Sequence, residues 1–246
     1  MKCYLFLREL DLKLIEEIKN KLEIVGIIFS EKRESQLKGI PFYSHEEFEK
    51  NVKNNNLKVD YIFSYYYQKK LSSEILKSAL KGAINIHPAP LPYYRGVGTY
   101  SLAILEELKF WGCSAHYMDE EYDNGEIIEV KTFPIDSLKE TYDSLEKKTK
   151  IYSYNLLIQV VENIISSRGL NRKKEIIDFK QIKYISRKKI NELKKITESD
   201  NLEMIEKKIR AFWKPPFSGA TIMLKGKEFT IVNEEILKII LESKEL

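Results

Sequence analysis

The chain has 246 residues, a length that fits one large domain or one domain with a small addition. Charged residues make up 32% of the sequence and hydrophobic residues 43%, a globular composition that excludes a disordered or fibrous chain. The formal net charge of +4, spread evenly along the chain, does not by itself indicate a nucleic-acid-binding protein.

The sequence shows no targeting or metal-binding signal. Residues 1–8 lack the apolar stretch and cleavage site of a signal peptide, and no run of about 18 apolar residues could span a membrane. Two cysteines and three histidines are too few for a disulfide framework or a zinc site. We therefore expect a soluble, cytoplasmic protein that holds no metal and attaches to no membrane.

The first part of the chain alternates short apolar runs with longer segments of helical period. The runs predict strands over residues 3–7, 25–30, 61–65 and 83–87. The longer segments predict helices over residues 11–22, 45–54, 72–80 and 99–108. Ser44 and Ser72, at two of the helix starts, are typical N-caps. The alternation predicts an α/β fold with a doubly wound, mostly parallel sheet.

The pattern changes in the middle of the chain. Two alternating runs, residues 114–118 and 126–134, flank residues 119–125 and predict a β-hairpin or two strands joined by a loop. A long helix is expected over residues 138–166, and its stop is expected near residues 168–169.

From about Asn171 the chain turns strongly basic, and we place a domain boundary there. Residues 1–170 are expected to form the main domain and residues 171–246 a small subdomain of helix, β-hairpin and helix. We interpret the basic clusters at residues 172–174 and 187–189 as solvated surface rather than as a phosphate site.

The small subdomain has its own pattern. A helix is predicted over residues 202–212, and a hairpin is predicted from residues 220–224 and 228–232. Because the alternating apolar residues of this hairpin need a cover, we expect a homodimer formed through the subdomain.

The strongest local feature is the end of the fourth predicted strand. Side chains alternate across a strand, so Asn85 and His87 project together from the face opposite to Ile84 and Ile86. Three prolines within residues 88–92 lack the amide hydrogen that a ladder needs, so the strand must end at His87. Both polar side chains therefore lie at the carboxyl end of a parallel strand, where open α/β sheets bind ligands.

A second polar cluster lies in residues 119–125. The sequence Asp-Asn-Gly at its end is typical of a tight turn, and it is also suited to hold Asp123 facing the imidazole of His87. Such a carboxylate orients the ring and stabilises its cation. Asp119 is the competing choice for this role.

Together these side chains suit acyl transfer to an amine. His87 can take the proton of the attacking amine, and Asn85 can donate a hydrogen bond to the oxyanion. No serine or cysteine lies beside His87 as a nucleophile, and the apolar setting of Cys113 indicates a buried, inert thiol. His45 and His116 form no ligand-spaced pair with His87, and we interpret both as more often structural than functional.

Over roughly residues 60–135, the sequence resembles the folate-dependent formyltransferases. The resemblance rests on Ile84-Asn85-Ile86-His87, Leu91-Pro92-Tyr93-Tyr94-Arg95-Gly96, Met118-Asp119 and Asp123-Asn124-Gly125. It implies a Rossmann-like domain that transfers the formyl group of 10-formyltetrahydrofolate to an amine. The catalytic asparagine, histidine and aspartate of that family correspond to Asn85, His87 and Asp123.

Other segments of the sequence indicate which kind of formyltransferase it resembles. Residues 7–11 contain no glycine, unlike the phosphate-binding turn of glycinamide-ribonucleotide formyltransferases. The residues after Asn171 are fewer than the tRNA-binding barrel of methionyl-tRNA formyltransferases needs, and the modest net charge disfavours tRNA. Residues 62–71 and 210–220 are instead similar to segments of nucleotide-sugar formyltransferases. The expected acceptor is a dTDP-linked 4-amino-4,6-dideoxyhexose, such as dTDP-4-amino-4,6-dideoxyglucose, for a surface polysaccharide or O-antigen.

The resemblance also implies binding residues. The expected folate contacts are Lys69, Lys70, Leu71, Asp119 and Tyr122. The expected nucleotide-sugar contacts are Tyr94, Arg95 and Trp213, with arginine for the pyrophosphate and aromatic rings for the base or sugar. Core packing of the tail is an equally good interpretation of Trp213.

Two alternatives stay open. One is the formylation of an aminoacyl-tRNA, and the other is a folate or nucleotide binder that has lost its chemistry. The second is disfavoured by the intact set of Asn85, His87 and Asp123, because a binder needs neither a base nor an oxyanion donor.

Overall fold

The computed structural model describes residues 1–31, 36–55, 57–166, 170, 183–215 and 219–242. The chain divides into two compact units. The first consists of residues 1–95, 112–131 and 151–182, and the second of residues 96–111, 132–150 and 183–246.

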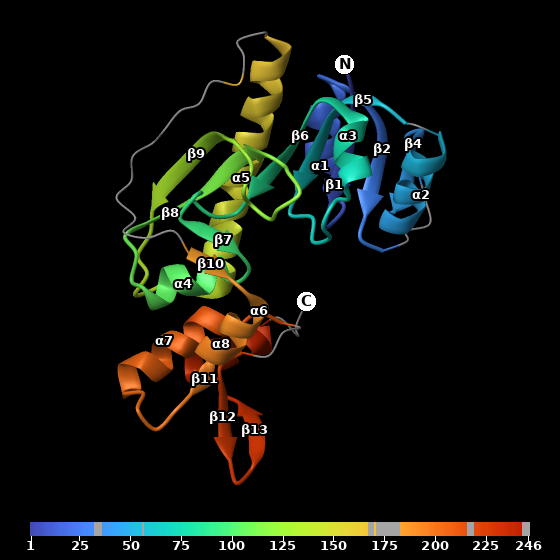
Figure 1. Ribbon diagram of the computed structural model, residues 1–246. Helices are drawn as coiled ribbons and strands as arrows, with labels where there is room; N and C mark the ends of the chain where they lie inside the picture. Colours follow the sequence, from blue (N-terminus) through green and yellow to red (C-terminus); the bar gives the residue numbers. More distant parts are fainter. Residues whose placement is uncertain (32–35, 56, 167–169, 171–182, 216–218, 243–246) are drawn as a thin grey trace. The chain divides into compact units, whose positions relative to one another are not determined.

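Strands and helices alternate along the first part of the chain, as expected (Figure 1). The strands are β1 Lys2–Leu7, β2 Glu23–Phe29, β3 Gln36–Leu37, β4 Ile40–Ser44, β5 Val59–Tyr65, β6 Ala79–His87, β7 Tyr94–Gly96, β8 Phe110–Tyr117, β9 Ile127–Pro134, β10 Lys183–Ile185, β11 Lys195–Ile196, β12 Thr221–Leu224 and β13 Lys227–Thr230. The helices are α1 Leu12–Lys19, α2 His45–Asn55, α3 Ser73–Ser78, α4 Thr99–Leu105, α5 Tyr142–Ile165, α6 Arg187–Leu193, α7 Leu202–Phe212 and α8 Glu234–Glu242.

One large sheet has the strand order β3-β4-β2-β1-β5-β6-β8-β9. The neighbouring pairs from β4 to β6 are parallel, and β8 runs antiparallel to β6. The chain builds outward from β1 through β2 and β4, and then returns to add β5 and β6 on the other side. This is the doubly wound, Rossmann-like arrangement, and its ligands bind beyond the carboxyl ends of the strands where the order reverses.

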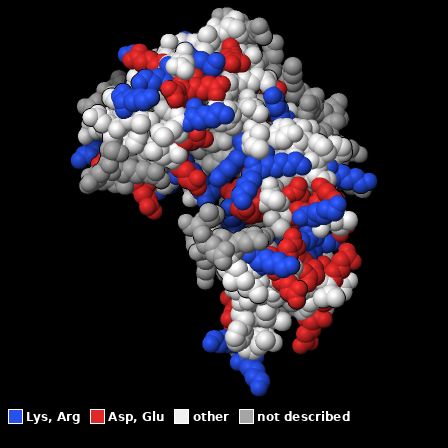
Figure 2. All heavy atoms as spheres, turned by 180° about the vertical axis from the view of Figure 1, so that it is seen from behind, with Lys and Arg blue, Asp and Glu red and all other residues white. Residues whose placement is uncertain are grey.

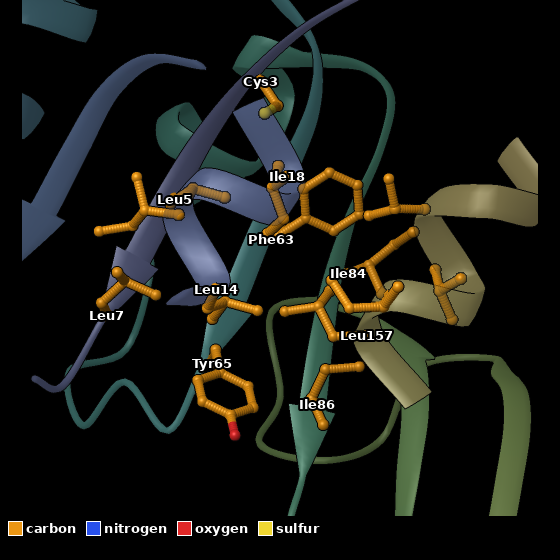
Figure 3. Close-up of a cluster of buried hydrophobic side chains, with 14 of the residues drawn as sticks. Cys3, Leu5, Leu7, Leu14, Ile18, Phe63, Tyr65, Ile84, Ile86 and Leu157 are labelled. Atoms are coloured by element: carbon orange, nitrogen blue, oxygen red, sulfur yellow. The ribbon is translucent and has the colours of Figure 1, made fainter. Parts of the chain in front are cut away.

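Both faces of the central strands are buried, which explains their nearly continuous apolar sequences. In β1, Cys3, Leu5 and Leu7 pack in one cluster with α1 and α5, whereas Tyr4 and Phe6 pack in another with α2 and α3. Figure 3 shows the first cluster, with side chains of α1 and α5 gathered around those of β1, β5 and β6. The alternation of side chains along each strand thus fills two cores, one on each face of the sheet.

The expected helix start at Ser44 is confirmed and is a capping box. The amide of Glu47 donates to the Ser44 hydroxyl at 3.2 Å, and the Glu47 carboxylate accepts from the Ser44 amide at 2.9 Å. Ser72 stands at the N-cap of α3 without a side-chain cap hydrogen bond. That helix ends at Ser78, earlier than expected, because β6 already begins at Ala79.

In the second unit, α7 is the main packing element of the tail. The hydroxyl of Ser101 in α4 donates to the carbonyl of Ala211 in α7 at 2.7 Å. The guanidinium of Arg210 donates to the carbonyls of Ser137 and Glu140 at 3.0 and 2.7 Å. These contacts tie residues from three distant parts of the sequence into one unit.

The expected tail elements are confirmed. The helix over residues 202–212 is α7, and the hairpin is β12 and β13, which pair antiparallel with Thr221 opposite Thr230. Its turn contains Lys225 and Gly226, both with positive φ. The helix α8 follows the hairpin, and the short elements β10, α6 and β11, which were not expected, precede α7.

The domain boundary expected at residue 171 lies outside the described residues, as do the basic cluster at 172–174 and the helix stop at 168–169. The two units do not follow one linear boundary, because residues 96–111 and 132–150 group with the tail. The second basic cluster falls at the start of α6, where its side chains are exposed.

The surface carries both signs of charge. In Figure 2, lysine and arginine side chains are interspersed with aspartate and glutamate over the face shown. Across the described ranges, each helix is too short or too polar to cross a lipid bilayer.

Candidate active site

The two polar side chains at the end of β6 lie where the sequence predicts. The strand ends at His87, directly before Pro88. Ile84 and Ile86 are buried in the core cluster that contains α1 and α5. Asn85 and His87 alternate with them and so belong to the other face of the strand.

The neighbouring strand β8 adds a third polar side chain, His116. In the antiparallel register, Asn85 lies opposite His116, and His87 lies opposite Ser114. The Asn85 side-chain nitrogen lies 3.1 Å from His116 Nε2. His116 was not predictable as a member of this cluster, because the pairing of β8 with β6 is not encoded in either strand alone.

The tautomer of His116 follows from its partners. Its Nδ1 lies 2.8 Å from the carbonyl oxygen of Tyr117, which can only accept, so Nδ1 carries the hydrogen. Its Nε2 therefore accepts from the Asn85 amide. Burial, followed by the nearby charge of His87, lowers the pKa of His116 to about 4. His116 is thus a neutral acceptor that fixes the amide orientation of Asn85.

His87 is buried, with 5% of its surface exposed, and both ring nitrogens face oxygen atoms. Its Nε2 donates to the carbonyl oxygen of Tyr94 at 2.8 Å. Its Nδ1 lies 3.4 Å from Asp123 Oδ1, and His116 Nε2 lies 3.9 Å from the same oxygen. In the neutral ring, Nδ1 is the basic nitrogen, and a proton taken up there faces a carboxylate.

The loop of residues 119–125 holds Asp123 by its backbone. Asp123 has φ of +52°, a left-handed conformation that aspartate tolerates better than most residues. Asp119, the competing choice, is used inside the loop, where its carboxylate accepts from the Glu121 amide at 2.8 Å and the Asn124 side chain at 3.3 Å. Asp123, rather than Asp119, is therefore the carboxylate at His87.

Gly125 closes the loop against β8. A Cβ atom at this position would lie 1.9 Å from the carbonyl oxygen of Tyr117. The Tyr117 amide donates to the Glu126 carbonyl at 2.8 Å, which fixes the return of the chain toward β9. Only glycine allows this close approach of the two backbone segments.

Ser114 fixes the proline-rich segment that follows His87. Its hydroxyl accepts from the Leu91 amide at 2.8 Å and donates to the Ala89 carbonyl at 2.7 Å. Because Ser114 is fully buried opposite His87, this segment is anchored to the same two strands as the polar cluster.

The residues expected to contact the folate differ in their partners and in their exposure. Lys69 pairs with Glu46 at 2.6 Å, and Lys70 lies over the ring of Tyr122, with its Nζ 5.6 Å from the ring centroid. The Leu71 side chain is buried in the core cluster with α2 and α3, so only its backbone can meet a ligand. The ring of Tyr122 is half exposed.

The residues expected at the nucleotide sugar differ in their placement. The Tyr94 side chain is 3% exposed, and its carbonyl contacts His87. Arg95 Nη2 donates to the carbonyl of Tyr122 at 3.0 Å. Trp213 belongs to the second unit, where it follows α7 and packs against a cluster with Ile209 and Ile236.

Both cysteines are buried in the structure. Burial raises the pKa of both Cys3 and Cys113 to about 12, so neither thiol ionises at neutral pH, as expected for Cys113. Within the described ranges, no three side chains of histidine, cysteine, aspartate or glutamate are grouped to hold a metal ion.

The arrangement combines a base with an oriented donor. His87 can accept a proton on Nδ1 beside the Asp123 carboxylate. The Asn85 amide gives one hydrogen to His116 and has a second to give to a developing oxyanion. These are the groups that transfer of an acyl group to an amine requires.

The comparison with known proteins agrees with this chemistry. A family model described as formyl transferase matches residues 16–161. A methionyl-tRNA formyltransferase of Halothermothrix orenii is 29% identical over 197 residues, which are 80% of this chain and 59% of that protein. The chain spans 22 to 59% of the length of three curated relatives that it matches.

Two solved structures share the fold. A sugar N-formyltransferase from Shewanella sp FDAARGOS_354 is 18% identical, with a TM-score of 0.71, over 95% of this chain and 97% of that chain. An N-formyltransferase from Helicobacter canadensis, solved with folinic acid and dTDP-3-aminofucose, is 22% identical, with a TM-score of 0.69, over 92% and 84% of the two chains. Because the family match covers more than half of the sequence and includes both β6 and the loop of Asp123, this chain belongs to the formyl transferase family.

Proposed function

We propose that the protein transfers the formyl group of 10-formyltetrahydrofolate to the amine of a nucleotide-linked amino sugar. The observation that carries the proposal is the polar cluster of Asn85, His87, His116 and Asp123, which combines a buried base with an oriented amide donor. The sugar product would serve the synthesis of a surface polysaccharide such as O-antigen, in the cytoplasm.

The catalytic roles follow from the hydrogen-bond partners. The amine attacks the formyl carbon and becomes positively charged, and His87 takes its proton on Nδ1. Asp123 stabilises the imidazolium that results. Asn85 donates its second N–H to the formyl oxygen, which gains negative charge when the amine attacks. The proton on His87 is then available to the folate nitrogen as this nitrogen leaves the formyl carbon.

The formyl donor supplies an activated one-carbon group, and the residues present fit such a ligand. The segment at residues 69–71 and the loop of residues 119–125 lie close together, since Lys70 Nζ is 5.6 Å from the centroid of the Tyr122 ring, and we place the flat, polar ring of the folate at these two segments. Our candidates for contact with the folate remain Lys69, Lys70, Leu71, Asp119 and Tyr122.

A dTDP-linked amino sugar is the preferred acceptor. The solved relative from Helicobacter canadensis was crystallised with dTDP-3-aminofucose, and the mixed charge on the surface of Figure 2 supports a small acceptor over a large polyanion. We keep a dTDP-4-amino-4,6-dideoxyhexose as the first candidate, with Tyr94, Arg95 and Trp213 as candidate contacts. Tyr94 is the weakest of the three candidates, because its ring is buried, its amide donates to the Pro90 carbonyl and its carbonyl accepts from His87.

A second candidate acceptor is methionyl-tRNA. The observation in its favour is the 29% identity to the methionyl-tRNA formyltransferase of Halothermothrix orenii. Retention on immobilised tRNA that weakens steeply with salt would support this candidate.

We also propose that the protein is a homodimer through its tail. Met223, Leu224 and Phe229 of the hairpin are 55, 52 and 41% exposed, and Leu237 and Leu241 of α8 are 47 and 57% exposed. Apolar side chains in this number on so small a subdomain favour burial against a second copy.

The test is mass spectrometry of a panel of dTDP- and UDP-linked amino sugars incubated with the protein and 10-formyltetrahydrofolate. We expect one panel member to gain one formyl group. The variants His87→Asn and Asp123→Asn serve as matched controls, which should bind folate yet form no product. If the protein binds folate but formylates no sugar, the proposed acceptor is wrong. If either variant forms product at the wild-type rate, the roles assigned to His87 and Asp123 are wrong.

A further inference from the structure

One short segment, Tyr94 and Arg95 of β7, contacts both catalytic parts of the site. The carbonyl oxygen of Tyr94 accepts from His87 Nε2 at 2.8 Å. The guanidinium of the next residue, Arg95, donates from Nη2 to the carbonyl of Tyr122 at 3.0 Å. Tyr122 directly precedes Asp123, so two adjacent residues contact the base and the backbone next to the carboxylate that faces it.

The Tyr122 carbonyl belongs to the peptide plane that leads into Asp123. The orientation of this plane, together with the positive φ of Asp123, sets the direction of the Asp123 side chain. The carboxylate of Asp119 and the amide of Asn124 stabilise the loop internally, but they do not attach it to β7. Arg95 provides that attachment.

The local chemistry of Arg95 is unusual for a surface cation. Its Nε is buried and, in the described part of the chain, has no hydrogen-bond partner. A buried donor without a partner costs free energy, so solvation of Nε does not explain the placement of this side chain. Its planar guanidinium keeps Nη2 directed at one carbonyl, which a flexible ammonium does less well.

We propose that Arg95 is a positioning residue for the Asp123 carboxylate. The proposal rests on the proposed function, because it assigns Arg95 to the geometry of the His87–Asp123 pair. It differs from the expectation that Arg95 binds the pyrophosphate of the acceptor. Loss of the guanidinium lets the Tyr122–Asp123 peptide turn and moves the carboxylate away from Nδ1 of His87.

Steady-state kinetics separates the two roles. We expect Arg95→Ala to lower kcat about 10- to 100-fold, the range for a catalytic group displaced by up to 1 Å, with KM for the acceptor changed less than about twofold. Arg95→Lys should recover part of kcat, because an ammonium can still donate to one carbonyl. The matched control is Lys58→Ala, since Lys58 donates to the Lys77 carbonyl at 3.0 Å on the exposed surface.

A second readout needs no acceptor. The chain has three histidines, so the ring signals of His87 can be assigned in a ¹H–¹⁵N NMR spectrum. We expect Arg95→Ala and Arg95→Lys to move the His87 signals in the same direction as Asp123→Asn does, with Arg95→Lys moving them less. The signals of His45 report that the fold is intact, and Lys58→Ala should leave both sets unchanged.

These outcomes decide the proposal whether or not the acceptor is right. A tenfold rise in acceptor KM with unchanged kcat and unchanged His87 signals would overturn it and assign Arg95 to the pyrophosphate. Unchanged kinetics and spectra would also overturn it. If the wild type formylates no sugar, the proposed function fails, and the NMR comparison still tests the link from Arg95 to the His87–Asp123 pair.

Discussion

Replacement of Gly125 by alanine should remove most of the activity while the protein stays folded. The added Cβ would lie 1.9 Å from the Tyr117 carbonyl oxygen, a backbone atom that cannot rotate away, whereas ordinary contacts begin at 3.4 Å. The separation must therefore grow by about 1.5 Å, by movement of the loop or of the end of β8. Asp123, two residues earlier, moves with the loop.

The expected magnitude follows from this displacement. A shift of about 1 Å in a catalytic group costs roughly 100-fold in rate, and we expect kcat of Gly125→Ala to fall at least that far. This equals about 2.7 kcal/mol of lost transition-state stabilisation. Overpacking at a loop costs about 1–3 kcal/mol of stability, which leaves the protein folded at assay temperature.

The assay is formyl transfer under saturating substrates, with the thermal midpoint of unfolding measured in parallel. Gly39→Ala is the control, because a Cβ there would meet nothing within 4 Å, although Gly39, unlike Gly125, has a positive φ, of +83°. That variant should lose about 1–2 kcal/mol of stability and keep its kcat. A kcat near the wild-type value in Gly125→Ala would refute the claim that this close approach positions Asp123.

Three further predictions concern the site and the tail. Asn85→Ala should lower kcat about 100- to 1000-fold, as expected for the loss of an oxyanion donor; a loss below tenfold in single-turnover experiments would exclude that role. Burial holds the pKa of folded His116 at about 4, against 6.5 for the ordinary group, so the unfolded chain binds an extra proton between these values. The free energy of unfolding should therefore fall as the pH drops from 6.5 to 4, by up to about 1.4 kcal/mol per pH unit. Urea titrations of His116→Gln should lack this component, and an identical pH slope in variant and wild type would contradict it. Leu224→Ser with Phe229→Ser should give a monomer in sedimentation at micromolar concentration, whereas a wild type already monomeric there would end the dimer proposal.

Much of the catalytic strand was predictable, because its signals are local. The alternation of Ile84 and Ile86 with Asn85 and His87 fixes which side chains share a face. The prolines after His87 fix where the strand ends. The turn sequence after Asp123 indicates a tight, left-handed backbone at that position. Each of these statements concerns neighbours in the sequence, and the structure confirms them.

The partners across strands were not predictable. His116 meets Asn85 only because β8 pairs antiparallel with β6 in one register, and a shift of one residue would turn His116 to the other face. The contact of Arg95 with the Tyr122 carbonyl depends equally on where the loop of residues 119–125 lies. Periodicity predicts faces and ends, but it carries no information on register or on the order of strands.

The sequence pattern also did not predict that residues 96–111 and 132–150 belong to the same unit as the tail. A change in composition suggested a linear boundary, whereas Ser101 bonds to Ala211 and Arg210 bonds to Ser137 and Glu140. Such long-range contacts join α4 and residues 132–150 to the C-terminal helices. They depend on side chains that look like ordinary surface residues in sequence.

The most direct test of the central claim follows an isotopically labelled formyl group from 10-formyltetrahydrofolate in one mixture that contains the amino-sugar panel and methionyl-tRNA. The proposed function predicts that the wild type places the label on the amine of one nucleotide-linked sugar, and that Asp123→Asn places it nowhere. Label on the tRNA instead, or label on the sugar by Asp123→Asn at the wild-type rate, would contradict it.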